Sequence, residues 1–352
     1  MSRHLLVTGS GGFVGGHVVA AARAAAGVRL RLLVRALPPA ADPPPAHGPP
    51  LEGDVPVEYV RADLADPGSL RGVCDGVDAV VHCAAQVGGD PRQLRRVNDL
   101  GTAALVEEAR RAGVERFVHL STAAVHGRGP FSGVRPGEAP IVPGSDTSRT
   151  RAAAERHVLA AGGTVLRPHL VYGAGDRWVA PGVLTVLRAL GGRPHGRLGR
   201  QSMIDAASLG DVLLAAALAP AARAGGAGRA GRVHFVNHPD PVPGEHLLAA
   251  VAEAHGLLPE SLPGVPADIA RARLRDHPLA RHHFELLAAD HWFTDDTVWT
   301  ELGCDPGAGF AERFRRHAGP YRDPPPVPDP SAGPAHLARE ATTSLRTPSS
   351  GT

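Results

Sequence analysis

Two side chains four residues apart raise the question of what chemistry this chain performs. Thr147 and Arg151 stand in the segment DTSRTRAAAERHVL, residues 146–159, which the pattern predicts to be a helix. Thr122 and His126 precede them in the segment STAAVHG. A threonine hydroxyl donates hydrogen bonds but is a very weak acid, and an arginine keeps its charge without passing protons. These groups can donate hydrogen bonds and hold a ligand, but the threonines and the arginine are not suited to supply a proton.

Histidine and tyrosine side chains are the alternatives for acid–base work. An imidazole ordinarily titrates near neutral pH, so His126 could be the acid, but its loop position beside Gly127 favours a polar residue that lines the substrate site. Tyr172 is one of three tyrosines in the chain, and we expect it either to line the substrate site or to pack. Tyr59 and Tyr321 fall in an expected strand and at the edge of an expected tail.

A run of histidines late in the chain invites interpretation as a metal site. RHHF occupies residues 281–284, and His291 follows beside it in HWF. The segment is predicted to be an amphipathic helix, and no acidic or cysteine partner stands at ligand spacing. The three cysteines, Cys74, Cys83 and Cys304, form neither a metal nor a disulfide pattern. We therefore predict no metal site and a reduced, cytoplasmic protein.

Glycines near the N-terminus predict a dinucleotide site. Gly9, Gly12 and Gly15 form a G-x-x-G-x-x-G turn between an expected strand at residues 4–8 and an Ala-rich helix. Glycines allow a tight turn and a close approach to a pyrophosphate, whose charge the helix N-terminus favours. Phe13 and Val14, inside the turn, join the expected cofactor-binding residues.

The ends of the next two strands bear on which dinucleotide binds. The second strand ends in Arg35, where a carboxylate would suit the ribose hydroxyls of NAD and an arginine suits the 2′-phosphate of NADP(H). The alternative is a solvated surface arginine, with NAD(H) also accepted. Asp63 and Leu64 end the third strand, and Asp63 either accepts the adenine amino group or caps a helix near Pro67.

Strands and helices alternate along the first half of the chain. Six strands are expected, at residues 4–8, 28–35, 57–64, 78–85, 115–127 and 162–173, with helices near 67–75, 93–113 and 146–159 between them. The alternation predicts an α/β fold, a Rossmann-type doubly wound parallel sheet with a smaller C-terminal substrate-binding lobe. The predicted units are a dinucleotide-binding core at 1–174, a substrate lobe at 175–320 interleaved with the last sheet strands, and a disordered tail at 321–352.

Composition excludes several classes of partner. The net charge of +2 does not favour nucleic acid or an anionic membrane, and no apolar run reaches the ~20 residues of a membrane span. The chain has no lysine, and all 37 of its basic residues other than histidine are arginine. We expect a monomer or homodimer with a small-molecule partner.

Seven motifs occur in one order, and together they resemble the extended short-chain dehydrogenase/reductase family. They are TGSGGFVG, ADL, HCAA, VNDLGT, STAAVHG, LRPHLVYGAGD and MIDAASLGDV. The resemblance covers roughly residues 4–320, and LRPHLVYGAGD with the segment from PLARHHF onward is most similar to the 3β-hydroxysteroid dehydrogenase branch.

The resemblance implies an active site of Ser or Thr with Tyr-x-x-x-Lys. Thr122 matches the hydroxyl position, but Thr147 and Arg151 stand at the tyrosine and lysine positions. Composition explains the change from lysine to arginine, but not the loss of the tyrosine. Arg151 is still expected to hold the cofactor ribose. The resemblance also places Ala84 and Pro168 at the cofactor, His169 near its nicotinamide, and Gln86, His126, Tyr172 and Trp178 at the substrate.

Three functions remain open from the sequence. The first is an atypical NADPH-dependent ketoreductase of antibiotic biosynthesis, which reduces an angucyclinone-like aromatic polyketide ketone that carries its own hydroxyl beside the carbonyl. The second is an NAD(P)-dependent epimerase, dehydratase or cyclase of secondary metabolism. The third is a non-catalytic dinucleotide-binding protein. Turnover of NADPH with aromatic ketones separates the first from the other two.

Overall fold

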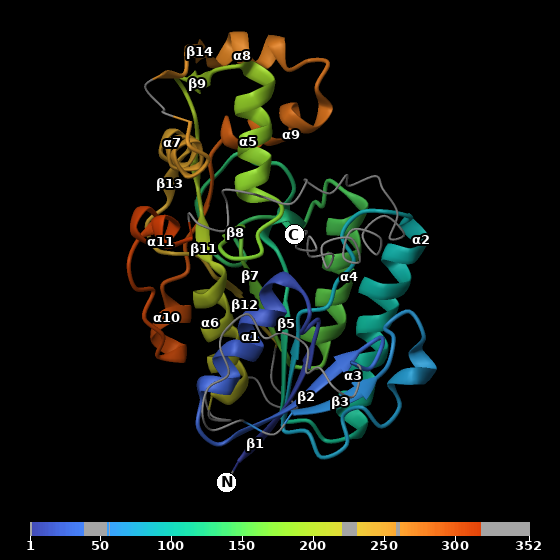
Figure 1. Ribbon diagram of the computed structural model, residues 1–352. Coiled ribbons are helices and arrows are strands. Elements are labelled where there is room, and N and C mark those ends of the chain that lie inside the picture. The colour runs from blue at the N-terminus through green and yellow to red at the C-terminus, as the bar shows by residue number, and fades with distance from the viewer. Residues whose placement is uncertain (1, 39–54, 56, 220–230, 258–260, 318–352) are drawn as a thin grey trace, which may run out of the picture.

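The computed structural model describes residues 2–38, 55, 57–219, 231–257 and 261–317 (Figure 1). The expected tail at 321–352 lies outside the described residues, as does most of the Pro-rich segment 36–56. The same is true of all but the last residue of AARAGGAGRAG, residues 221–231, for which the composition favours a flexible surface connection. No helix in the described part of the chain is long and apolar enough to cross a membrane.

The main sheet is parallel and confirms the predicted fold class. Its order is β12-β7-β5-β4-β1-β2-β3. The strands are β1 (Arg3–Thr8), β2 (Val28–Val34), β3 (Val57–Arg61), β4 (Ala79–His82), β5 (Arg116–Leu120), β7 (Thr164–Arg167) and β12 (Arg232–Phe235). Successive strands are added on one side of β1 up to β3 and on its other side from β4 onward. Ligands of such sheets bind beyond the carboxyl ends of the strands at this switch point.

Helices cover both faces of this sheet (Figure 1). On one face lie α1 (Phe13–Ala24), α6 (Ala206–Leu218) and α10 (Thr297–Leu302). On the other lie η1 (Pro67–Leu70), α2 (Pro91–Leu94), η2 (Arg95–Leu100), α3 (Gly101–Arg111) and α4 (Asp146–Ala160). Alternate strand residues serve the two faces: Leu5 and Val7 pack under α1 and α6, whereas Leu6 packs toward α3.

A second layer of helices and short strands stands beyond one end of the sheet (Figure 1). Its helices are α5 (Val179–Leu190), α7 (Gly244–Ala254), α8 (Ala267–Arg273), α9 (Pro278–Leu287) and α11 (Phe310–Arg316). The short strands pair as β8 (Leu170–Tyr172) with β11 (Met203–Asp205), and β9 (Arg193–His195) with β14 (Gly264–Pro266). A four-stranded sheet has the order β13 (Val242–Pro243), β10 (Arg200–Gln201), β15 (His291–Phe293) and β6 (Phe131–Val134).

Several expected elements differ in the structure. The strand expected at 115–127 ends at Leu120, and the 3₁₀ turn η3 (Ala123–His126) follows it. The strand expected at 162–173 ends at Arg167 and resumes at Leu170 in a different sheet, because Pro168 has no N–H to donate to a ladder. The helix expected at 67–75 is the short 3₁₀ turn η1, which ends before Gly72 and its φ of +83°. The helix expected at 93–113 contains the π-helical turn η2. His291 lies in β15 and not on the helix that carries RHHF.

Candidate active site

The glycine turn after β1 has the geometry of a dinucleotide cradle. Gly9 has a φ of +70°, which residues with a side chain rarely adopt. A Cβ at Gly15 would stand 2.0 Å from the Gly9 carbonyl oxygen. The first turn of α1 holds no acidic residue, and Gly12 at its N-cap offers no side-chain cap. The helix N–H groups are therefore open to an anion, and the turn fits a pyrophosphate.

The second layer reaches the glycine turn through the loop after β8. A Cβ at Gly175 would stand 3.2 Å from the Phe13 ring, and His17 Nε2 lies 3.1 Å from the Ala174 carbonyl oxygen. Trp178 follows in this loop, at the N-cap of α5. The structure therefore brings Phe13, which is expected at the cofactor, close to the segment that leads to Trp178, which is expected at the substrate.

The candidate adenosine end lies at the carboxyl ends of β2 and β3. Arg35 follows β2, is exposed and has no ion-pair partner among the described residues. Asp63 Oδ1 accepts a hydrogen bond from Ala65 N at 2.9 Å, so it closes a turn. The N-cap of η1 is Asp66. Leu64 is buried at 5 % exposure, so its backbone is what it can offer a ligand.

The side chain of Asn98 holds the loop that follows β4 through two hydrogen bonds, a role that the sequence pattern did not predict. Its Oδ1 accepts from Gln86 N at 2.8 Å, and its Nδ2 donates to the Gln86 carbonyl at 2.9 Å. Ala84 in the same loop donates from its N to Thr8 Oγ1 at 3.2 Å. The only signal in the sequence was an amide in the VNDLGT motif, on an otherwise apolar helical face.

The two threonines present hydroxyl protons that no described acceptor takes. Thr147 Oγ1 accepts a hydrogen bond from Gly88 N, and Thr122 Oγ1 accepts one from Ala124 N, both at 3.1 Å. Neither hydroxyl donates to an acceptor within the described residues. Each oxygen is therefore fixed by a backbone N–H while its proton remains available to a ligand.

Arg151 lies buried between the ends of β4 and β5. One guanidinium nitrogen, Nη2, donates to the Leu120 carbonyl, and Nε is enclosed without a partner. Burial, at 8 % exposure, lowers the pKa of Arg151 from its usual value. Burial also raises the pKa of the nearby Cys83 thiol to about 12, so that thiol is neutral at physiological pH. Among the described residues Nη1 has no hydrogen-bond partner, and it is not one of their enclosed unpartnered atoms, so it is the nitrogen left for a ligand.

Both ring nitrogens of His126 make hydrogen bonds within the protein. Arg167 Nη1 donates to His126 Nε2 at 3.1 Å, so the proton is on Nδ1, which donates to the Pro140 carbonyl at 2.9 Å. Arg167 is itself held by two hydrogen bonds to Glu155. Burial is the main cause that lowers the pKa of His126. The geometry is that of a neutral structural histidine rather than a proton donor.

The structure does not bring Tyr172 together with the two threonines. Its ring packs against Phe310 and Phe314 of α11 and is 2 % exposed, and burial raises the pKa of its phenol. Pro168, in contrast, lies beside the threonine loop, the segment from Thr122 to His126 that follows β5. Its carbonyl accepts a hydrogen bond from Ala123 N at 2.8 Å.

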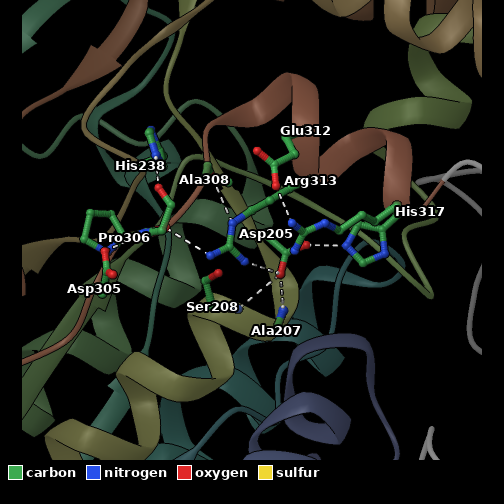
Figure 2. Close-up of polar contacts among 12 residues, drawn as sticks. Asp205, Ala207, Ser208, His238, Asp305, Pro306, Ala308, Glu312, Arg313 and His317 are labelled. Carbon is green, nitrogen blue, oxygen red and sulfur yellow. Dashed lines mark hydrogen bonds and ion pairs between the residues drawn. The ribbon is translucent and has the colours of Figure 1, made fainter.

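Asp205 and His317 form a carboxylate–histidine pair between α6 and the end of α11 (Figure 2). The His317 ring also contacts the ring of Tyr172. Asp205 caps α6 through Ala207 N and Ser208 N, and it accepts from His317 Nε2 beyond α11. Arg313 Nη1 of α11 lies 3.7 Å from the same carboxylate. These contacts tie α11 to α6, and Asp205 is 3 % exposed.

The doubly wound sheet with an open glycine turn at its switch point is the arrangement of the α/β folds that bind dinucleotides. The chain belongs to the NAD dependent epimerase/dehydratase family, whose model matches residues 5–194.

Relatives in this family include reductases. The chain is 30 % identical over 290 residues to the 2-alkyl-3-oxoalkanoate reductase of Stenotrophomonas maltophilia, which covers 74 % of this chain and 85 % of the relative. It is 28 % identical over 321 residues to the 4-hydroxy-2-methyl-3-oxo-4-farnesyl-3,4-dihydroquinoline-1-oxide ketoreductase of Stigmatella aurantiaca, with 84 % and 90 % covered. The Bordetella bronchiseptica enzyme WbmH, solved in complex with NAD⁺, shares the fold at a TM-score of 0.68 and 18 % identity, over 92 % of this chain and 99 % of that chain.

Proposed function

We propose that this enzyme is an NADPH-dependent ketoreductase of antibiotic biosynthesis that reduces an angucyclinone-like aromatic polyketide ketone. The observation that carries the proposal is the pair of threonine hydroxyls, Thr122 and Thr147, whose protons are unclaimed at the carboxyl edge of the sheet. Two neutral donors of this kind suit a carbonyl oxygen. Two relatives whose names describe ketone reduction, from Stenotrophomonas maltophilia and Stigmatella aurantiaca, support the same reaction class.

The chain's own residues hold the dinucleotide along the carboxyl edge. The turn of Gly9, Gly12 and Gly15 takes the pyrophosphate, and Arg35 takes a 2′-phosphate, which favours NADPH. Arg151 offers Nη1 to the ribose on the nicotinamide side. When bound, the dinucleotide supplies the hydride for the carbonyl carbon.

The proton for the ketone oxygen does not come from a strong acid of this chain. The tyrosine position holds Thr147, Arg151 cannot pass a proton, and both nitrogens of His126 are engaged. The loss of a general acid typically lowers the rate by about 10²–10⁴-fold. Alignment of the hydride donor with the carbonyl can still lower the activation free energy by about 7–11 kcal/mol. A phenol beside the ketone can give its proton to the new alkoxide, and the phenolate then regains a proton from water.

A panel of bicyclic ketones tests the proposal. NADPH consumption is followed with 1-tetralone, 8-hydroxy-1-tetralone and 8-methoxy-1-tetralone, and the alcohol is identified by mass. We expect reduction of the 8-hydroxy ketone to be fastest. Tight binding of NADPH without reduction of any ketone would instead support a non-catalytic or an epimerase function.

A further inference from the structure

The amide of Gln201 is oriented by two backbone carbonyls. Gln201 is fully buried, and its Nε2 donates to the Leu286 carbonyl at 3.0 Å and to the Ala289 carbonyl at 2.9 Å. A flipped amide would point its oxygen at both carbonyl oxygens, which is unfavourable. The amide oxygen Oε1 is therefore the atom that faces His169, at 3.3 Å from its Nε2.

This orientation fixes the tautomer of His169. Since Gln201 Oε1 only accepts hydrogen bonds, His169 Nε2 must carry the ring proton. Burial and then the charge of the neighbouring His291 lower the pKa of His169 to about 3, so the ring is neutral at physiological pH. A neutral ring with its proton on Nε2 leaves Nδ1 as a bare hydrogen-bond acceptor.

The protein holds this acceptor rigidly beside the threonine loop. His169 follows Pro168, whose carbonyl is bonded to Ala123 N, and its own N donates to Asn237 Oδ1 at 2.9 Å. Its ring stacks on His291 at 5.5 Å between centroids and 9° between planes. Nδ1 has no partner among the described residues and is not one of their enclosed unpartnered atoms, so it is the ring nitrogen left for a ligand.

A bare acceptor repels a ketone oxygen and attracts a hydroxyl. We propose that His169 Nδ1 accepts a hydrogen bond from a second hydroxyl of the substrate, away from the reacting carbonyl, and so selects hydroxylated ketones and orients them. This inference rests on the proposed ketoreductase function and deepens it. The hydroxyl next to the ketone cannot be this group, because its single proton points at the ketone oxygen.

The variants distinguish the effect of the hydrogen-bond acceptor from the effect of the shape of the ring. His169→Phe keeps a flat ring against His291 and removes both nitrogens. His169→Asn places an amide oxygen the same number of bonds from Cα as Nδ1, so it retains an acceptor. The same change to Phe at the exposed His246 on α7 is the matched control. Thermal unfolding confirms that each variant folds.

The measurement is kcat/KM for 5-, 6- and 7-hydroxy-1-tetralone against their methyl ethers. Wild type should prefer at least one free phenol over its ether by about 10- to 100-fold, the effect of one buried hydrogen bond. His169→Phe should reduce that ratio to near one, His169→Asn should keep part of it, and His246→Phe should keep all of it. ¹⁵N NMR of the wild-type protein, with the His169 signals assigned from the Asn variant, should show the proton on Nε2.

Four results would overturn the inference. One is a phenol-to-ether ratio that is unchanged in His169→Phe while that variant is folded. Another is a proton on Nδ1 in the NMR spectrum. A third is weaker NADPH binding with an equal loss for every ketone, since the donor would then be the carboxamide of the cofactor. The fourth is a wild type that reduces none of the ketones, including unsubstituted 1-tetralone, which removes the proposed function and this inference together.

Discussion

The oxygens of Thr122 and Thr147 are each fixed by a backbone N–H, and this distinguishes them from ordinary surface hydroxyls. A fixed oxygen points its remaining proton in a limited set of directions, so each hydroxyl can polarise a carbonyl. Neither can replace a phenol of lowered pKa, because an aliphatic hydroxyl does not ionise in water at physiological pH. Their contribution is therefore a hydrogen bond and not a proton.

The threonine variants should be mild. Thr147→Ala and Thr122→Ala should each lower kcat/KM for 8-hydroxy-1-tetralone by no more than one lost hydrogen bond, about 1–3 kcal/mol. Steady-state kinetics at saturating NADPH measure this. Thr185→Ala on α5, where the hydroxyl donates only to the Pro181 carbonyl, is the matched control.

Cofactor choice depends on Arg35. Arg35→Asp should weaken NADPH binding by about 10- to 100-fold, the loss of a charge-assisted hydrogen bond, and leave NADH within a few-fold. Fluorescence titration of both cofactors measures it. Arg29→Asp makes the same charge change on the exposed surface of β2, away from the carboxyl edge. Equal binding of both cofactors by wild type, unaffected by Arg35→Asp, would exclude a 2′-phosphate site here.

At the scale of elements, the glycine turn and α1 form the part of the site that the backbone alone determines. A Cβ at Gly12 would stand 3.1 Å from the Gly9 carbonyl oxygen, a tight contact that requires a shift of a few tenths of an ångström, and Gly12 has an ordinary φ of −89°. We expect a larger side chain there to enter the space that a bound pyrophosphate needs.

Gly12→Val should therefore abolish dinucleotide binding while the protein still folds. Titration with NADPH and with NADH, alongside circular dichroism and thermal unfolding, distinguishes the two effects. Tight binding by the folded variant would remove the turn from the cofactor site.

The sequence predicts the elements that local patterns encode and misses those that depend on distant partners. The parallel sheet, α1 and α4 follow from the alternation of strands and helices, the glycine placement and the helix pattern at 146–159, and the structure confirms this fold class. The pairing of β6 with β15 joins segments about 160 residues apart and has no local signal. The tautomer of His169 depends on Gln201, whose orientation depends on two carbonyls of another segment.

At the scale of the whole molecule, neutral histidines buried in the fold couple stability to pH. His82, His169 and His283 have pKa values lowered to about 3, 3 and 4, and His119 also lies well below its usual value, with burial the first cause in each. Because these pKa values are lowered in the folded state, the unfolded chain binds more protons below about pH 6.5. Stability is therefore full above that pH and falls as the pH decreases toward the folded pKa values.

The free energy of unfolding should decrease from pH 7 to pH 5, by up to about 1.4 kcal/mol per pH unit for each such histidine. Urea unfolding at a series of pH values measures the slope. His119→Leu, at a ring whose two nitrogens have no hydrogen-bond partner within the described part of the chain, should make the slope shallower. A stability that rises toward pH 5 would contradict the neutral state of these rings.

The central claim is that the substrate, and not the protein, supplies the proton. The most direct measurement is a pair of comparisons of kcat/KM. The first compares 8-hydroxy-1-tetralone with 8-methoxy-1-tetralone in wild type. The second compares wild type with Thr147→Ala and His126→Gln on the 8-hydroxy ketone. The account predicts that the methyl cap costs about 10²-fold or more, as expected for a missing acid, while Thr147→Ala costs far less and His126→Gln acts only through local packing. Binding of both ketones is measured separately. A loss of about a thousandfold on either substitution, with binding and folding intact and the methyl ether reduced as fast as the phenol, would contradict the claim and return the acid to the protein.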